Sequence, residues 1–377
     1  MDLFINKIKT GSGKQWFWII VTSICFAASM LFVYNNAFLY ERSIAKVIEA
    51  NIEELTEGTD MYGNYDQRFT QHLIAQIKNG EERGQLIHLI NEYSASGGFD
   101  QGYRVGNELF VSIDEKTEMD LTGAILDVKR DKYIMLVAWL FIITLLLVGK
   151  KQGLFSIISL VINAVLLSFA LDLYLNTTNI SLLLICSISA IIFTIISLLL
   201  VNGLNEKTYA AIVATLLGTF LSLLIAYVVM WVTSGSGLRY EDMQFITRHY
   251  QTVFMAGVFI GSLGAVMDVA ITMSSSIFSL YEQNHKISVK ALKLSGMDIG
   301  KDIMGTMTNI LFFAYISGSI PMLILYFKNA SPFWFTLSMN LSLELARALA
   351  GGIGIVLTIP IGLYTAIFFV NRKRSRA

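Results

Sequence analysis

The feature that most constrains this chain is a series of long apolar stretches separated by short polar connections. A helix that spans a bilayer needs roughly 20 mostly apolar residues, and about eight stretches meet that length. They cover residues 16–36, 133–149, 153–175, 179–201, 208–233, 252–277, 304–327 and 348–370. Because backbone hydrogen bonds inside a bilayer must be satisfied within the protein, the sequence predicts an all-α polytopic membrane bundle of about eight transmembrane helices.

Composition agrees with a membrane protein and argues against several other classes. Of the 377 residues, 54% are hydrophobic and 15% charged, whereas soluble domains hold about 25% charged residues. The formal net charge of +0 gives no support for nucleic-acid binding. Cys25 and Cys186 lie in apolar stretches, and His72 and His88 lack metal-ligand spacing. Since motifs for nucleotide binding or catalysis are also missing, we expect no enzyme, cofactor or metal site.

Lys and Arg in the short connections predict the orientation of the spans. The connections on one side are poor in them, because residues 171–179 contain none and residues 326–334 contain only Lys328. On the other side lie Lys150, Lys151, Lys207, Lys286, Lys290, Lys293 and Lys301, together with Arg372, Lys373, Arg374 and Arg376 of the tail. Basic loops stay in the cytoplasm, so both termini are expected to be cytoplasmic in a bacterial cell membrane.

The first apolar stretch has two interpretations. It follows Lys7, Lys9 and Lys14, as the apolar part of a cleaved signal peptide would. It is also long, begins with aromatic residues at Trp16 and shows no small-residue cleavage site, which favours a retained signal anchor. The first predicted domain, residues 1–36, is therefore a cytoplasmic N-terminus and signal-anchor helix.

Residues 37–132 are too polar to span a membrane and form the second predicted domain. Alternating segments such as residues 45–50, punctuated by glycines, are typical of strands, and residues 78–85 predict a hairpin connection. The pattern of residues 60–71 leaves a loop and a helical start open. We expect a small extracytoplasmic β-rich domain here, followed by a multi-helix transmembrane domain with a basic cytoplasmic tail over residues 133–377.

The stretch 252–277 carries an aspartate near its middle. Small and polar residues recur along it at spacings of four, three, four, four and three, which places them on one face of a helix. They are Gly257, Gly261, Gly264, Asp268, Thr272 and Ser275. Glycines on such a face let another helix approach closely, so the sequence predicts helix packing at the glycines and a polar seam at Asp268.

Two later stretches carry similar polar faces. The first has Asp302, Thr306 and Asn309, which follow one another at four and three. The last helix has the longest face, with Asn340, Glu344, Arg347, Gly351, Gly354, Thr358, Gly362 and Thr365. The glycines again predict packing, and the Glu344–Arg347 pair is either a gate or an interfacial ion pair. We predict that the three polar faces meet in a translocation seam.

Asp268 is the candidate for proton or ion coupling. A charged residue near the bilayer centre costs about 2.5–3.5 kcal/mol and is usually functional. The alternative is a purely structural hydrogen bond between helices. Such a bond contributes only about 0.6 kcal/mol on average, which does not offset the cost.

Three segments resemble the YibE/F family of bacterial membrane proteins. They are GSLGAVMDVAITMSSS at 261–276, LSGMDIGKDIMGTMTNILFFAY at 294–315, and the pattern LxxELARALAGGIGIVLTIP at 341–360. The anchor and outer domain resemble the longer, YibE-type member, which is often accompanied by a shorter paralogue. The resemblance therefore implies a permease of undefined substrate, with a shorter YibE/F-type partner or a homo-oligomer.

A fainter resemblance connects the chain to SecF and the RND superfamily. The shared features are an anchor helix, an outer domain, a helix with an acidic residue, a basic amphipathic loop (here residues 278–303) and a Thr-rich helix. In those proteins an intramembrane acidic residue couples to protons, and Asp268 is in the matching place. The chain departs from that pattern by about two extra spans.

The sequence thus favours a secondary transporter or permease of the bacterial cytoplasmic membrane, with proton coupling through Asp268 and an unknown transported substrate. The alternative is a non-transporting, SecF-like membrane factor that assists protein export or envelope assembly through its outer domain. A receptor is the weaker interpretation, because no sizeable cytoplasmic output domain is predicted.

Overall fold

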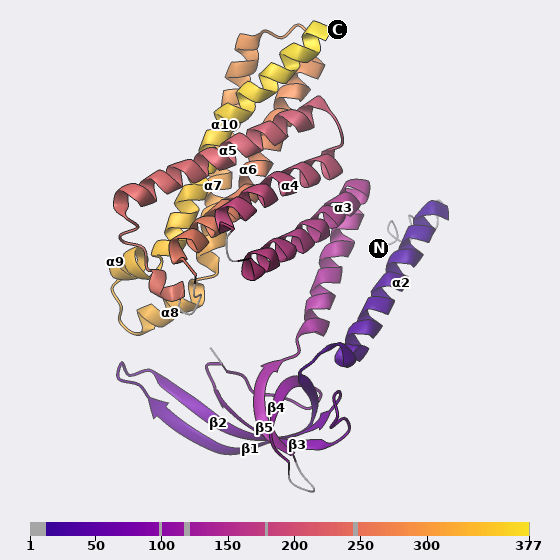
Figure 1. Cartoon of the computed structure of the whole chain (residues 1–377), viewed down its shortest axis with the longest axis vertical. Coiled ribbons are helices and arrows are strands. Elements are labelled where there is room, and N and C mark those ends of the chain that lie inside the picture. The colour runs from indigo at the N-terminus through magenta and orange to yellow at the C-terminus, as the bar shows by residue number, and fades with distance from the viewer. Residues whose placement is uncertain (1–12, 98–99, 117–120, 178–179, 244–247, 377) are drawn as a thin grey trace, which may run out of the picture. The chain divides into compact units, whose positions relative to one another are not determined.

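The structure is a computed structural model that describes residues 13–97, 100–116, 121–177, 180–243 and 248–376. The chain divides into two compact units, residues 1–144 and residues 145–377. Figure 1 labels the helices and strands along the chain. Lys7 and Lys9, which precede the first apolar stretch as in a signal peptide, lie outside the described residues.

The first unit holds helix α2 (Gly13–Asn35) and a closed β-barrel. The strands of the barrel are β1 (Ser43–Thr59), β2 (Tyr65–Ile77), β3 (Leu86–Ser94), β4 (Glu108–Lys116) and β5 (Leu121–Val128). They follow the order β1-β2-β3-β5-β4, with β4 pairing with β1 to close the barrel and β3 parallel to β5. This connectivity is that of the OB-fold. The predicted small β-rich domain is confirmed as a barrel.

Alternation of apolar and polar residues explains why these segments form strands. Val47, Leu73 and Leu89 come from three strands and are buried in the core of the barrel, while their neighbours in sequence face outward. Residues 78–85 form the predicted hairpin connection between β2 and β3. In the segment 60–71, where the pattern left a loop and a helical start open, residues 60–64 form the turn between β1 and β2 and residues 65–71 belong to β2.

A buried lysine, Lys129, joins the barrel to the helices that flank it in the sequence. Its side chain is 3% exposed, and its Nζ lies 3.4 Å from the carboxylate of Glu108 in β4. The same Nζ lies 2.9 Å from the carboxylate of Asp131, the first residue of α3, and donates to the carbonyl of Val33 in α2 at 3.1 Å. One ammonium group with three oxygen partners therefore fixes α2, β4 and the start of α3 to one another.

The rest of the chain is helical. After α3 (Asp131–Asn176) come α4 (Leu182–Asn202), α5 (Glu206–Thr233), α6 (Tyr250–Gln283), α7 (Val289–Ser317), α8 (Ile320–Lys328), α9 (Phe333–Phe335) and α10 (Ser342–Arg376). Among the described residues, six helices are long and apolar enough to cross a membrane. The pair α7–α8, bent by 60°, adds a seventh if it crosses as one broken span.

One of the six, α3, covers two of the predicted spans. Its 46 residues would measure about 69 Å as a straight helix, more than twice the roughly 30 Å of a bilayer core. Lys150 leaves helical geometry, with φ 47° and ψ −119°. A side chain at Gly153 would overlap the carbonyl of Leu145, so the chain turns tightly there. The break separates the predicted stretches 133–149 and 153–175.

The prediction of a loop over residues 278–303 is wrong. Helix α6 continues to Gln283 and α7 begins at Val289, so only residues 284–288 connect them. Arg374 near the end of α10 donates to the carbonyl of Ile287 at 2.8 Å and holds this short connection. Of the basic residues in this segment, Lys286 lies in the connection, and Lys290, Lys293 and Lys301 lie on α7.

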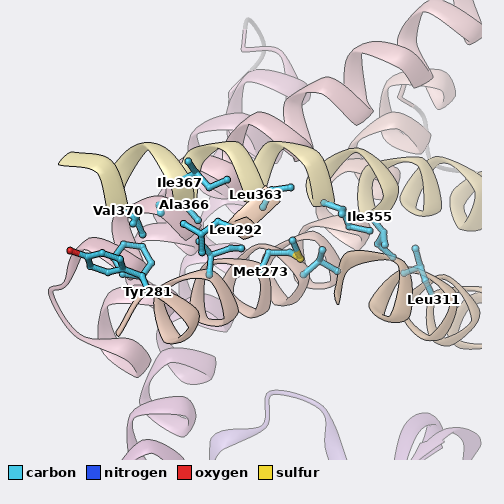
Figure 2. Close-up of a cluster of buried hydrophobic side chains, with 14 residues drawn as sticks. Met273, Tyr281, Leu292, Leu311, Ile355, Leu363, Ala366, Ile367 and Val370 are labelled. Carbon is cyan, nitrogen blue, oxygen red and sulfur yellow. The ribbon is translucent and has the colours of Figure 1, made fainter. Parts of the chain in front are cut away.

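Helix α10 packs against α5, α6 and α7 and is the central helix of the second unit. Buried apolar side chains fill the space between α6, α7 and α10, as Figure 2 shows. Ile355 and Leu363 of α10 lie against Met273 of α6 and Leu292 of α7 in this cluster. The contact surface is apolar, and its residues recur at the helical period.

The Lys129 contacts predict a large effect of one substitution. Lys129→Met removes the ammonium partner of Asp131 and one of the two ammonium partners of Glu108, which Lys78 also contacts. Breaking a buried ion pair costs about 3–5 kcal/mol. We expect the free energy of unfolding of the barrel unit to fall by that order, measured by pulse proteolysis of the detergent-purified protein across a urea series.

The matched control is Arg130→Met. Arg130 pairs with Asp127 at 3.0 Å, but both side chains are more than half exposed, and such surface pairs contribute about 0–1 kcal/mol. An equal loss in both variants would show that burial of the Lys129 network does not matter.

Candidate functional site in the helical unit

Asp268 lies near the middle of α6, on the more exposed face of that helix. Its side chain is exposed, and Thr272 and Ser275 on the same face are partly exposed. Among the described residues, no side chain or backbone group forms a hydrogen bond or ion pair with the Asp268 carboxylate. The carboxylate is therefore open to whatever surrounds a single copy of the chain.

The opposite face of α6 is the one that packs. Val266, Val269, Ala270, Met273 and Ile277 are fully buried and recur at three, one, three and four residues. These larger apolar side chains bury more surface than the glycines and hydroxyls do. The apolar face of α6 therefore makes the contact with α10. The predicted polar seam at Asp268 stays a prediction.

The three glycines of the Asp268 face differ in their surroundings. A side chain at Gly261 would overlap the hydroxyl of Tyr315 on α7. The nearest atom at Gly257 is Nε of Arg347, at 4.0 Å, and at Gly264 nothing lies within 4 Å. Of the three, Gly261 is therefore in close contact with α7, Gly257 lies at the edge of contact with α10, and Gly264 has no close neighbour among the described residues.

Helix α7 presents its polar residues outward as well. Asp302, Thr306 and Asn309 are all exposed, and no hydrogen bond joins any of them to Asp268. The two helices run antiparallel, with Gly296 of α7 beside Ile277 of α6 and Tyr315 beside Gly261. Interpolation between these two contacts sets Asp268 at about the level of residues 306–307, from the 1.5 Å rise per residue of both helices. The polar residues of α6 and α7 thus share a level without touching.

The polar residues at the start of α10 form a separate cluster. Arg347 donates to Glu344 at 2.6 Å, and its guanidinium lies 5.4 Å from the ring centre of Phe254. Asn340, which ends a π-helical turn (Thr336–Asn340), is buried and accepts a hydrogen bond from Arg239. The predicted Glu344–Arg347 pair therefore exists, but it lies apart from Asp268.

Two residues of this region were missed by the sequence analysis. Arg239 precedes α6 and contacts Asn340 and the hydroxyl of Tyr326, residues about 90 to 100 positions away. Tyr315 has a buried hydroxyl with no hydrogen-bond partner among the described residues. Neither carries a local signal, because both depend on contacts between distant helices.

The small residues of α10 are buried inside the chain. A side chain at Gly351 would overlap Leu311 of α7, and one at Gly354 would lie 3.1 Å from Ser222 of α5. Ser222 also donates to the carbonyl of Ala350 at 2.8 Å. This face is a packing surface between helices, and it leaves no room for a polar pathway.

Metal binding has no support in the described part of the chain, where no three His, Cys, Asp or Glu side chains gather around a common point. The candidate chemical group of the helical unit is the carboxylate of Asp268 in the apolar helix α6. An exposed carboxylate can accept hydrogen bonds or pair with a cation that approaches it from outside the chain.

Comparison with known proteins gives a family assignment. A family model described as YibE/F-like protein matches residues 137–372, and one described as YibE/F family N-terminal domain matches residues 38–128. No curated protein and no solved structure matches the chain, and nothing in the comparisons supports the fainter resemblance to SecF and the RND superfamily. The two matches cover the barrel and the helical unit in succession, and the chain belongs to the YibE/F family.

Proposed function

We propose that this chain is a subunit of a secondary transporter, or permease, of the bacterial cytoplasmic membrane, in which Asp268 takes up and releases a proton or another cation. The observation that carries this proposal is the position of Asp268, exposed and without a partner in the middle of the apolar helix α6. The role is not enzymatic, and its energy comes from an ion gradient.

The free-energy cost of placing a charged Asp268 in the membrane supports the proposal. A charge at mid-membrane costs about 2.5–3.5 kcal/mol, and the described residues supply no hydrogen bond or cation that offsets it. Either water or a second subunit must therefore reach the Asp268 face. In both cases the carboxylate lies at a boundary of the chain, where a path for protons and substrate can run.

A partner subunit completes the path in this proposal. The residues that face outward on α6 and α7 include Gly257, Gly264, Asp268, Asp302, Thr306 and Asn309. Small residues permit close approach of a second backbone, and polar ones supply hydrogen bonds to it. We propose that a shorter YibE/F-type paralogue, or a second copy of the chain, covers this face and forms the translocation seam with it.

The membrane topology in this proposal has eight spans. The break at Lys150 divides α3 into two spans, and the bent pair α7–α8 counts as one. Short connections rich in Lys and Arg stay in the cytoplasm. Both termini and the 284–288 connection are therefore cytoplasmic in this proposal, and the barrel is outside.

A second candidate function rests on the barrel. Strands β1 and β2 extend as a ribbon whose turn exposes Met61 by 88% and Tyr62 by 55%. Exposed apolar side chains at the tip of a hairpin can contact another protein. A membrane factor that assists protein export or envelope assembly would use this tip and would tolerate a neutral residue at position 268.

The topology is tested by cysteine labelling in intact cells. In a chain with Cys25→Ser and Cys186→Ser, we expect an impermeant thiol reagent to label Glu81→Cys in the barrel and to leave Lys290→Cys unlabelled until the membrane is permeabilised. Both positions are exposed, so accessibility within the protein is matched. Labelling of Lys290→Cys from outside would contradict the proposed orientation.

Coupling is tested by Asp268→Asn, which keeps the size of the side chain and removes its ability to ionise. We expect this variant to fold normally, to lose complementation of a deletion strain, and to lose proton flux into proteoliposomes under an imposed gradient. Thr272→Val, one turn away, removes a hydroxyl only and is expected to weaken both activities without abolishing them.

The same experiment separates the two candidate functions. Wild-type complementation and an unchanged pH response in Asp268→Asn would exclude coupling through this residue. If Met61→Ser then abolished complementation, the assembly-factor function would be favoured.

Assembly is tested at Gly264. Gly264→Leu adds a side chain where no atom of this chain lies within 4 Å, so the thermal stability of the isolated chain is expected to stay unchanged. Co-purification with the shorter paralogue, or with a differently tagged second copy, is expected to fall. Gly351→Leu provides the contrast, because it overlaps Leu311 and should destabilise the chain itself. Undiminished co-purification of Gly264→Leu would show that the partner does not cover this face.

A further inference from the structure

An apolar hollow of about 360 Å³ lies on the surface of the helical unit between α5 and α10. Its wall consists of Val213 of α5 with Tyr364, Thr365, Phe368 and Phe369 of α10, and carries no charged group. The hollow is close to the C-terminal end of α10 and the N-terminal end of α5, near the end of the bundle where the basic tail lies (Figure 1).

A cation stands at the rim of this hollow. Nζ of Lys293, on the second turn of α7, lies 4.8 Å from the ring centre of Tyr364. Lys293 is exposed and has no carboxylate partner among the described residues. Arg372 follows Phe368 by four residues and Phe369 by three, so it lies one turn beyond the hollow on the same face of α10.

The other cations of the tail are already engaged. Lys373 lies 3.6 Å from the carboxylate of Glu282, and Arg376 lies 3.8 Å from that of Glu206. Arg374 is held by the connection between α6 and α7, as described above. Lys293 and Arg372 thus lie beside the hollow, and neither is paired with a carboxylate among the described residues.

We propose that this hollow and its two cations form a binding site for an anionic phospholipid. An acyl chain occupies the apolar hollow, and the phosphate of the headgroup lies between Lys293 and Arg372. The chemistry of the site requires both parts, because the wall is mainly apolar and carries no charge, while Lys293 and Arg372 supply positive charge beside it. Basic residues between membrane helices at the cytoplasmic surface are suited to such headgroups.

The test is thermal unfolding of the detergent-purified full chain with added phosphatidylglycerol or phosphatidylcholine, together with native mass spectrometry of bound lipid. We expect phosphatidylglycerol to raise the Tm of the wild type more than phosphatidylcholine does. Lys293→Gln is expected to weaken phosphatidylglycerol binding by about tenfold, the scale of one lost charge-assisted hydrogen bond.

The matched control is Lys290→Gln, which removes the same charge from an exposed position one turn earlier on α7, away from Tyr364. It is expected to bind phosphatidylglycerol like the wild type. Equal losses in Lys290→Gln and Lys293→Gln would show non-specific attraction to a basic surface and would overturn the proposal. A wild type that does not distinguish the two lipids would overturn it as well.

The hollow is tested independently of the charge. Phe368→Ser places a hydroxyl in the wall, and we expect it to weaken binding of phosphatidylglycerol while leaving binding of glycerol phosphate, which has no acyl chain, unchanged. If inorganic phosphate or glycerol phosphate protects the wild type as well as phosphatidylglycerol does, the rim binds a free anion and the lipid site is excluded.

Discussion

The close contact of α10 with its neighbours is the interaction on which the helical unit depends. In a bilayer, apolar side chains gain little by leaving lipid for protein, so helices associate where small residues let their backbones approach. Gly218 of α5 lies directly against Thr358 of α10, and Gly354 of α10 lies against Ser222 of α5. The hydroxyl of Thr358 donates within its own helix, to Gly354, and so costs no unsatisfied group. This contact sets how the other helices are arranged around α10.

The division of α6 into two faces follows from that arrangement. Helix α10 already supplies the small residues at the contact, so α6 and α7 can contribute larger ones, such as Met273 and Leu311. Gly257 and Gly264 of α6 lie on the exposed side of the helix together with Asp268. The two small-residue faces of the chain therefore serve different purposes, one within the chain and one at its boundary.

Local sequence patterns predicted the helices and strands of this fold, but they could not predict contacts between residues far apart in the chain. Strand alternation identified the barrel, since burial on one face produces a period of two, but β5 was not singled out because Gly123 interrupts its pattern where the strand passes close to the carbonyl of Ser112. Helical periodicity placed Asp268 and Gly264 on one face, as the structure does. It could not tell whether that face points inward, because both faces of α6 show the same period. The Arg239–Asn340 contact joins residues 101 positions apart and had no local signal.

Because Asp268 is exposed, the proposed function depends on what surrounds the chain and not on a single chain alone. If the carboxylate were enclosed by α7 and α10, a single chain could isolate it from lipid and alternate its access to the two sides. As it stands, the surroundings of Asp268 are set by what lies outside this chain, and the cost of about 2.5–3.5 kcal/mol for a mid-membrane charge is met there or by protonation. A protonated Asp268 can face lipid, whereas an ionised one requires water or a partner. In the proposed transporter, coupling and assembly are therefore linked at this residue, because a partner that covers the Asp268 face also changes the surroundings of the carboxylate.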